Sequence, residues 1–150
     1  MDRDLSTDRR VFEDEQFTLD QCDSCLVPGY LILRLKGAST SLGWLSPGTD
    51  HALGAMLSGA VSAIEEVVAP ERVYCLSFGE IEPRLHFHLF PRTRALLEAY
   101  WRATGTAGEP VNGPRLFEWA RTAVVADRPL AAGLQGVEAA CLALRKVLRA

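Results

Sequence analysis

One short segment, residues 84–92, constrains the fold of this chain more than any other part of it. It reads RLHFHLFPR, and apolar side chains occupy alternate positions: Leu85, Phe87 and Leu89. The positions that alternate with them carry basic side chains: Arg84, His86 and His88. A period of two is typical of a β-strand with one buried face. The segment therefore predicts a strand whose apolar face enters a hydrophobic core.

The opposite face of this strand would carry two imidazoles and a guanidinium. Imidazole titrates near neutral pH and can act as a nucleophile or as a proton donor. His86 and His88, roughly 7 Å apart along a rigid strand and next to Arg84, would offer a site for an anion. The alternative is that one or both histidines are structural, packed or exposed to solvent.

This segment resembles the signature of the histidine-triad (HIT) superfamily of nucleotide hydrolases and transferases. In that signature three alternating histidines on a strand are followed by two apolar residues and often by Pro-Arg. The order of the upstream segments is also similar: residues 28–33 resemble the first long strand, 45–47 the start of the main helix, and 72–80 the strand and turn before the signature. The resemblance runs from about Val11 to Arg92, with a weaker echo at 113–118. Arg84 stands where the first histidine of the signature is expected.

The resemblance implies an α+β fold, in which a twisted antiparallel sheet of about five strands carries one main helix, with extra C-terminal helices. The 150 residues fit a single domain. We expect a loose N-terminus over residues 1–10, a core over 11–92 and a helical extension over 93–150. The resemblance also implies a homodimer.

Local patterns predict the elements of this domain. Strands are expected over residues 30–36, 73–78 and 85–90, with shorter strand-like pieces between 11 and 19. Ser46-Pro47 would supply the cap and first turn of a helix that ends before Pro70. Further helices are expected over residues 95–103, 115–124 and from about 127 onward. The last of these carries an apolar seam that would dock on the domain or on a second subunit.

Composition limits the partners and the compartment. A formal net charge of −3, with no Lys/Arg run, gives no general attraction to long nucleic acids. The first residues lack the apolar segment of a signal peptide, and no apolar stretch is long enough to span a bilayer. We therefore expect a cytoplasmic protein that binds no membrane, and whose four cysteines are reduced thiols or metal ligands.

Cys22 and Cys25 form a Cys-x-x-Cys pair, which is commonly half of a tetrahedral zinc site. The resemblance implies that the other two ligands would stand at Ala38 and Arg84, and neither side chain can bind zinc. His86 and His88 could complete the set, but the chemistry would then lose its imidazoles. A redox role for the pair is disfavoured, because it leads into residues 26–29 and not into a helix. We expect no cofactor, and the pair to be the relic of a metal site.

The resemblance implies covalent nucleotidyl transfer. His86 would attack the α-phosphorus of a nucleotide, with its other ring nitrogen held by a backbone carbonyl. His88 would donate a hydrogen bond to a phosphate or leaving-group oxygen, and Arg84 could grip the phosphate without serving as acid or base. Ser77 is a further candidate phosphate contact, or an ordinary strand hydroxyl.

Three classes of function remain open on the sequence. The first is an enzyme that hydrolyses or transfers a nucleotide from a phosphoanhydride or phosphoramidate. The second is a nucleotide-binding protein that has lost turnover, which the arginine at position 84 would explain. The third is a scaffold or dimerisation module.

Overall fold

The computed structural model describes residues 9–126 and 136–149. Its centre is a five-stranded antiparallel sheet with the strand order β1-β2-β3-β5-β4. The strands are β1 Arg10–Glu13, β2 Phe17–Gln21, β3 Leu31–Leu35, β4 Arg72–Leu76 and β5 His86–Arg92. The predicted α+β class and the antiparallel sheet are confirmed.

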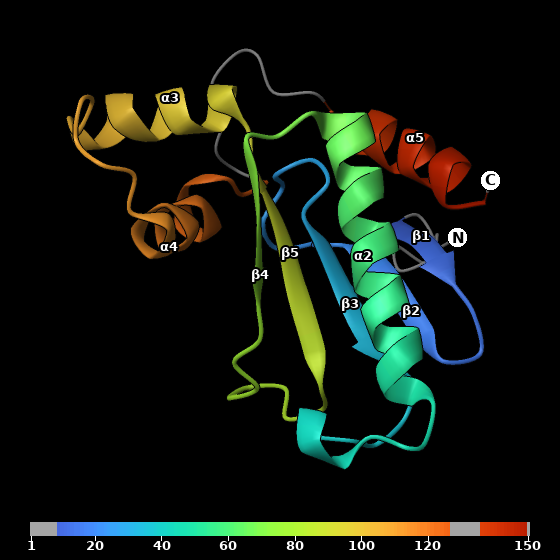
Figure 1. Ribbon diagram of the computed structural model, residues 1–150. Helices are drawn as coiled ribbons and strands as arrows, with labels where there is room; N and C mark the ends of the chain where they lie inside the picture. The colour runs from blue at the N-terminus through green and yellow to red at the C-terminus, as the bar shows by residue number, and fades with distance from the viewer. Residues whose placement is uncertain (1–8, 127–135, 150) are drawn as a thin grey trace.

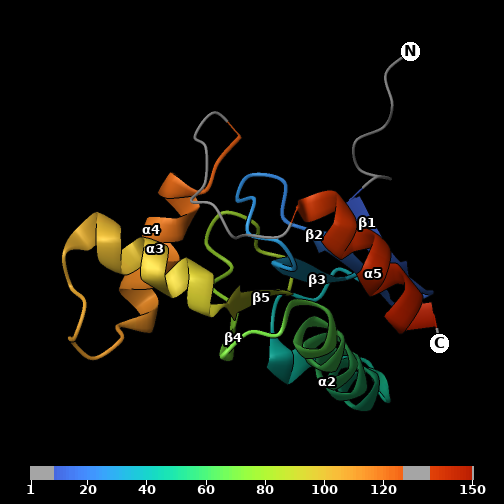
Figure 2. The same ribbon diagram turned by 90° about the horizontal axis from the view of Figure 1, so that it is seen from above.

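The other regular elements of the described residues are helices (Figure 1). They are the 3-10 turn η1 Leu42–Trp44 and the helices α2 Thr49–Val68, α3 Arg94–Thr104, α4 Gly113–Ala123 and α5 Val137–Arg149. α3 and α4 lie together near the β4 edge of the sheet, whereas α5 lies near β1 (Figures 1 and 2). None of the helices in the described part is long and apolar enough to cross a bilayer.

The face of the sheet under α2 holds the predicted hydrophobic core. β3 and β5 are neighbours, and Leu33 is paired with Phe87 in their register. The buried side chains on this face come from alternate positions along and next to these two strands: Leu31, Leu33, Leu35, Leu85, Phe87 and Leu89. Leu53 and Ile64 of α2 pack on them. The alternation in residues 84–92 therefore predicted the buried face correctly.

The histidine face of the sheet is covered by a second hydrophobic core. Tyr30, Ile32 and Phe90 on this face pack against α3 and α4, which contribute Leu96, Leu97, Leu116 and Phe117. α2 and the α3–α4 pair thus lie on opposite faces of the sheet (Figure 2). α3 and α4 close one end of the face that carries His86 and His88.

The start predicted for the main helix was wrong by one turn. α2 begins at Thr49, after Gly48, which has a left-handed φ of 86°. The Thr49 amide donates to the Ser46 carbonyl at 3.0 Å, so Ser46 and Pro47 belong to a turn before the helix. Ser46 therefore does not cap α2. The predicted end is confirmed, since Ala69 terminates the helix immediately before Pro70.

α5 docks on the domain through the predicted apolar seam. Its buried residues Cys141 and Leu144 join the core under α2, and Arg145 Nε donates to the Arg10 carbonyl at 2.8 Å. Docking was one of the two outcomes expected from the sequence. The expected start of this helix near residue 127 lies outside the described residues. At the other end, Arg10 belongs to β1 and not to a loose segment, while residues 1–8 lie outside the description.

Candidate active site

The two histidines lie side by side on β5, flanked by β3 and β4. His86 is opposite Arg34 of β3, and His88 is opposite both Ile32 of β3 and Leu76 of β4. The two imidazole centroids are 5.2 Å apart with an interplanar angle of 61°. A central strand holds both side chains on one face, as their spacing predicted.

The orientation of His86 is set by the backbone of its own segment. His86 Nδ1 lies 2.8 Å from the Arg84 carbonyl oxygen. A carbonyl can only accept a hydrogen bond, so Nδ1 is the donor and Nε2 is the nitrogen with the lone pair whenever the ring is neutral. This is the arrangement expected of a nucleophilic histidine. The side chain is almost buried, and it lines two cavities of the described structure.

His88 is held by Tyr30, a side chain with no solvent exposure. The Tyr30 hydroxyl lies 2.6 Å from His88 Nδ1. Burial raises the pKa of Tyr30, so the phenol keeps its proton and can donate it to this nitrogen. Burial also lowers the pKa of His88 to about 4, with further lowering by His86 and nearby arginines. His88 is therefore neutral at neutral pH, which favours a hydrogen-bonding role over that of a proton donor.

Both imidazoles line a cavity of about 460 Å³ that is rich in guanidinium groups. Three arginines line it, namely Arg9, Arg34 and Arg121, against two carboxylates, Asp20 and Asp23. The arginines and carboxylates alone give this lining a formal charge of +1. The cavity thus suits an anion such as a phosphate group.

The arginines of this cavity have different partners. Arg34 Nη1 lies 3.5 Å from Asp20 Oδ2, and Asp20 is also bound by Arg10. Arg9 Nη1 is buried and has no hydrogen-bond partner among the described residues. Arg121 lies over the Phe117 ring at 5.6 Å, and no carboxylate in residues 9–126 or 136–149 forms an ion pair with it. Arg9 and Arg121 thus carry positive charge that no described carboxylate neutralises.

Arg84 lies beside His86 but outside this cavity. It lines a smaller cavity of about 220 Å³ together with Arg34, Lys36 and His86. Its guanidinium is exposed and bound to Glu82, with Arg84 Nε 3.0 Å from Glu82 Oε1. Arg84 therefore contributes its carbonyl to His86, while its side chain would have to leave Glu82 to reach a phosphate between the histidines.

Ser77 is not brought to the histidines. It directly follows the last residue of β4, is exposed, and lines neither of the described cavities that contain His86. The alternation of β4 places position 77 on the side of Val73, which faces the core under α2. The geometry therefore offers no support for its expected phosphate contact.

Cys22 and Cys25 do not form a metal site with other described residues. Cys25 Sγ donates to the Ala120 carbonyl at 3.5 Å, and Cys22 Sγ lies 3.5 Å from Ser24 Oγ. Burial raises the pKa of Cys25 to about 11, which disfavours the thiolate that zinc requires. In the described part of the chain no group of three or more His, Cys, Asp or Glu side chains is arranged to hold a metal. These donors do not fit a zinc ion, and the zinc content of the protein stays a prediction.

Sequence reasoning missed several residues of the site. Arg34 could have been recognised as a site residue. It is two residues from Ile32 and four from Tyr30 along the same predicted strand, so its side chain points to the histidine face as theirs do. Arg9 and Arg121 gave no signal, since only tertiary structure brings them to β5. Tyr30 lies at the start of the strand predicted over residues 30–36, but its bond to His88 was not foreseen.

Three solved structures identify the fold. No protein-family model matches the sequence, and a search of curated proteins finds no match. The chain is similar to a hypothetical histidine triad nucleotide-binding protein from Sulfolobus tokodaii, with a TM-score of 0.56 and 16% identity over 94% of this chain and 80% of that one. It is also similar to a zinc-bound histidine triad family protein from Mycobacterium smegmatis, with a TM-score of 0.54 and 17% identity over 93% and 83% of the two chains. A HIT-like protein involved in cell-cycle regulation from Bartonella henselae gives a TM-score of 0.50 and 18% identity over 75% and 81%. The chain therefore has the fold of the histidine-triad superfamily.

Proposed function

We propose that this protein is a nucleotide hydrolase or nucleotidyl transferase that acts on a nucleoside phosphoanhydride or phosphoramidate through a nucleotidyl-histidine intermediate. The observation that carries the proposal is the contact between His86 Nδ1 and the Arg84 carbonyl, which makes Nε2 the attacking nitrogen of the neutral ring beside a cationic cavity. Fold similarity supports a nucleotide as the ligand, since the Sulfolobus tokodaii structure is described as nucleotide-binding.

In the first step the lone pair of His86 Nε2 forms a bond to the α-phosphorus. The bond from phosphorus to the leaving oxygen or nitrogen breaks, and the leaving group takes the bonding electrons and a proton from water. Nδ1 keeps its proton, so the cationic ring of the intermediate faces the Arg84 carbonyl. Arg9, Arg34 and Arg121 offset the charge that develops on the phosphate oxygens.

His88 contributes a hydrogen bond and no proton. With Tyr30 as donor to Nδ1, the single ring proton of His88 is on Nε2, where it can reach a phosphate or leaving-group oxygen. In the second step water or another acceptor attacks phosphorus, the nitrogen–phosphorus bond breaks and its electrons return to His86. The proton of the attacking water passes to solvent, and the site regains its first state.

One observation favours the alternative of a nucleotide-binding protein without turnover. The position expected for the first histidine of the signature carries Arg84, whose guanidinium is bound to Glu82. An arginine stays protonated at physiological pH, so it cannot act as a general acid or base. Binding of AMP with no turnover of any phosphoramidate or phosphoanhydride tested, unchanged in Arg84→His, would establish this alternative.

Turnover of an adenosine 5′-phosphoramidate tests the enzyme directly. We expect His86→Ala to abolish it and to remove the AMP adduct that intact-mass spectrometry detects after a quench in denaturant at alkaline pH, where the nitrogen–phosphorus bond survives. His88→Ala should slow it on the order of a hundredfold, the usual cost of one transition-state hydrogen bond. His51→Ala is the matched control, because His51 is an exposed histidine of α2. An adduct that persists in His86→Ala would contradict the proposal.

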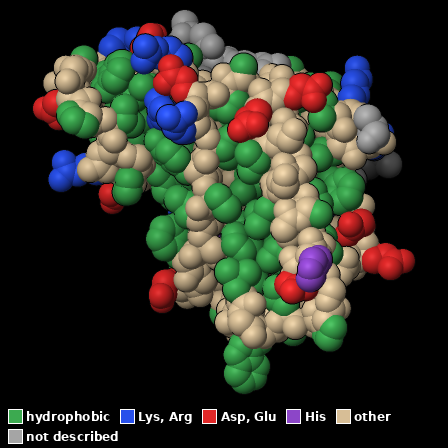
Figure 3. Space-filling model, in the orientation of Figure 1, with side chains coloured by type: hydrophobic (Ala, Val, Ile, Leu, Met, Phe, Trp, Pro, Cys, Tyr) green, Lys and Arg blue, Asp and Glu red, His purple; other side chains and the backbone are tan. Residues whose placement is uncertain are grey.

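The proposal includes a homodimer in the cytoplasm. Half-buried apolar side chains gather along α2 and the edge strand β4, among them Met56, Val61 and Val73 (Figure 3). Such a strip beside an unpaired strand edge favours self-association. All four cysteines are free thiols, as expected in a reducing compartment. Sedimentation velocity showing a monomer at high protein concentration would contradict the dimer.

A further inference from the structure

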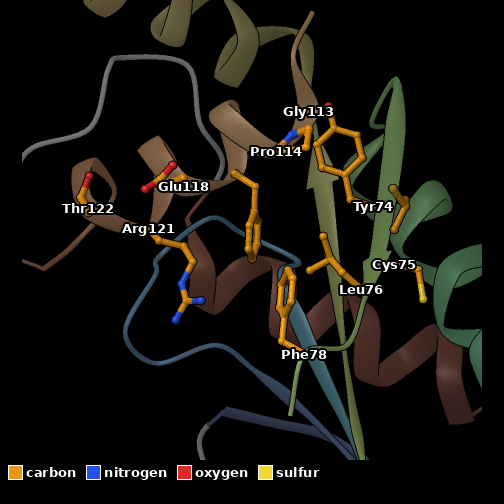
Figure 4. Close-up of a pocket in the computed structure, with 11 residues that line it drawn as sticks. Tyr74, Cys75, Leu76, Phe78, Gly113, Pro114, Glu118, Arg121 and Thr122 are labelled. Carbon is orange, nitrogen blue, oxygen red and sulfur yellow. The ribbon is translucent and has the colours of Figure 1, made fainter. Parts of the chain in front are cut away.

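A further cavity lies outside the histidine site. It has a volume of about 1060 Å³. It lies between α4 on one side and, on the other, β4 with the residues that follow β4. Tyr74, Leu76 and Phe78 line one side, and Glu118, Arg121 and Thr122 of α4 line the other (Figure 4). We call it the β4–α4 cleft. An apolar and aromatic lining with a few polar groups is typical of sites for small organic molecules.

The β4–α4 cleft adjoins the histidines. Leu76 lines it and is the β4 partner of His88. Phe117 also lines it, and its ring centroid is 6.1 Å from that of His88. Arg121 lines both the cleft and the cationic cavity. A ligand held between His86 and His88 can therefore extend past Arg121 into the cleft.

The two spaces differ in chemistry. The cationic cavity offers arginines and imidazoles, which suit the phosphate, whereas the cleft offers the rings of Tyr74, Phe78 and Phe117. A molecule that fills both has an anionic phosphorus centre joined to a bulky apolar group. The aromatic rings favour an aromatic group, because offset and edge-to-face ring contacts add to the gain from burial.

We propose that the β4–α4 cleft binds an aromatic leaving group, so that the preferred substrates are nucleotides whose α-phosphorus carries an aryl-bearing amine or alcohol. This inference rests on the proposed function and deepens it. The bond that breaks joins phosphorus to the nitrogen or oxygen of that group. The group takes its proton from water and departs through the cleft, while the nucleotide stays on His86 until water or another acceptor attacks.

Two adenosine 5′-phosphoramidates test the proposal, one with methylamine and one with 2-naphthylmethylamine on phosphorus. We expect the naphthylmethyl substrate to have a kcat/KM at least about tenfold above that of the methyl substrate, since filling an apolar pocket is typically worth that factor or more. Phe78→Ser should bring this ratio close to one. Phe78 is two-thirds exposed, so the variant should fold. Ile81→Ser is the matched control, because Ile81 is fully exposed, is absent from the cleft lining and should keep the wild-type ratio.

Binding separates this proposal from the proposed function. The Kd values of AMP and of its 2-naphthylmethyl ester, measured by calorimetry on the His86→Ala protein, do not depend on turnover. Tighter binding of the ester, lost in His86→Ala/Phe78→Ser, would support the cleft even if no substrate were turned over. Equal Kd values, or a preference that Phe78→Ser leaves intact, would overturn it. A Phe78→Ser protein that loses self-association while the two ligands still bind equally would assign the cleft to a second copy of the chain and would also overturn it.

Discussion

At the scale of single residues, the pair formed by Tyr30 and His88 shows how burial selects one chemical role for a histidine. The hydroxyl of the buried Tyr30 lies 2.6 Å from Nδ1 of the neutral His88 imidazole, on the histidine face of the sheet. Because Tyr30 occupies Nδ1 of His88, only Nε2 of that ring is available to contact a ligand. The pair also makes the protein sensitive to pH.

His88 should make the free energy of unfolding fall in weak acid. Its pKa is about 4 in the folded protein, below its ordinary value of 6.5. Between these values the unfolded chain binds a proton that the folded chain does not, so acid favours unfolding. This contribution is complete above about pH 6.5 and is lost as the pH falls toward about 4. Urea denaturation at several pH values measures it. His88→Gln should flatten the dependence, and His51→Gln should not.

Arg121 should hold the phosphate of a nucleotide. It lines the cationic cavity and has no carboxylate partner among the described residues, so a phosphate would gain a charge-assisted hydrogen bond. Arg121→Gln should weaken AMP binding by about tenfold, the equivalent of roughly 1.4 kcal/mol. Arg115→Gln, on an exposed position of the same helix, serves as the control. Equal AMP affinities for the two variants in calorimetry would contradict the prediction that Arg121 binds the phosphate.

At the scale of elements, the entry into β3 depends on one glycine. Gly29 has a φ of 80°, and a Cβ built on it would lie 2.6 Å from Val68 Cγ2. The turn joins the Cys22–Cys25 loop to the strand that pairs with β5, and the Gly29 amide donates to Gln21 Oε1. The backbone at Gly29 thus passes close to the end of α2 just before β3 begins.

Gly29→Ala should lower the free energy of unfolding by more than about 1–2 kcal/mol, the cost of a left-handed L-residue alone. The contact with Val68 adds to this cost. Gly37→Ala is the matched control, since a Cβ there meets no atom within 4 Å and its φ is not positive. That variant should change the free energy of unfolding by less than about 0.5 kcal/mol. Equal urea midpoints for both variants would contradict this view of the turn.

Elements whose pattern is local could be predicted from the sequence, and their arrangement could not. The period-two alternation identifies the buried face of β5, because neighbouring strand residues must point to opposite sides. The docking of α4 on Tyr30 and Phe90 has no local signature. The sequence predicted no helix over the histidine face. That α4 covers this face, and hence that Arg121 joins the site, depends on contacts between distant segments.

At the scale of the whole molecule, the metal content tests what the Cys-x-x-Cys pair contributes. We expect less than one zinc per chain in protein purified without chelator, because Cys25 donates to a backbone carbonyl and no third described ligand lies nearby. Elemental analysis measures the ratio. One zinc per chain would contradict the prediction and would require a rearrangement that brings His86 or His88 to the cysteines.

The two hydrophobic cores on opposite faces of the sheet also have a consequence for the order in which the molecule opens. α3 and α4 are anchored to one core only, while β3 and β5 contribute to both. Elements with fewer anchors open with a lower free energy than the global transition. In native-state hydrogen exchange the amides of α3 and α4 should therefore exchange before those of β3 and β5, and uniform protection across these four elements would contradict this. The histidine pocket would then be assembled and dismantled as a separate cooperative unit on a platform that stays folded.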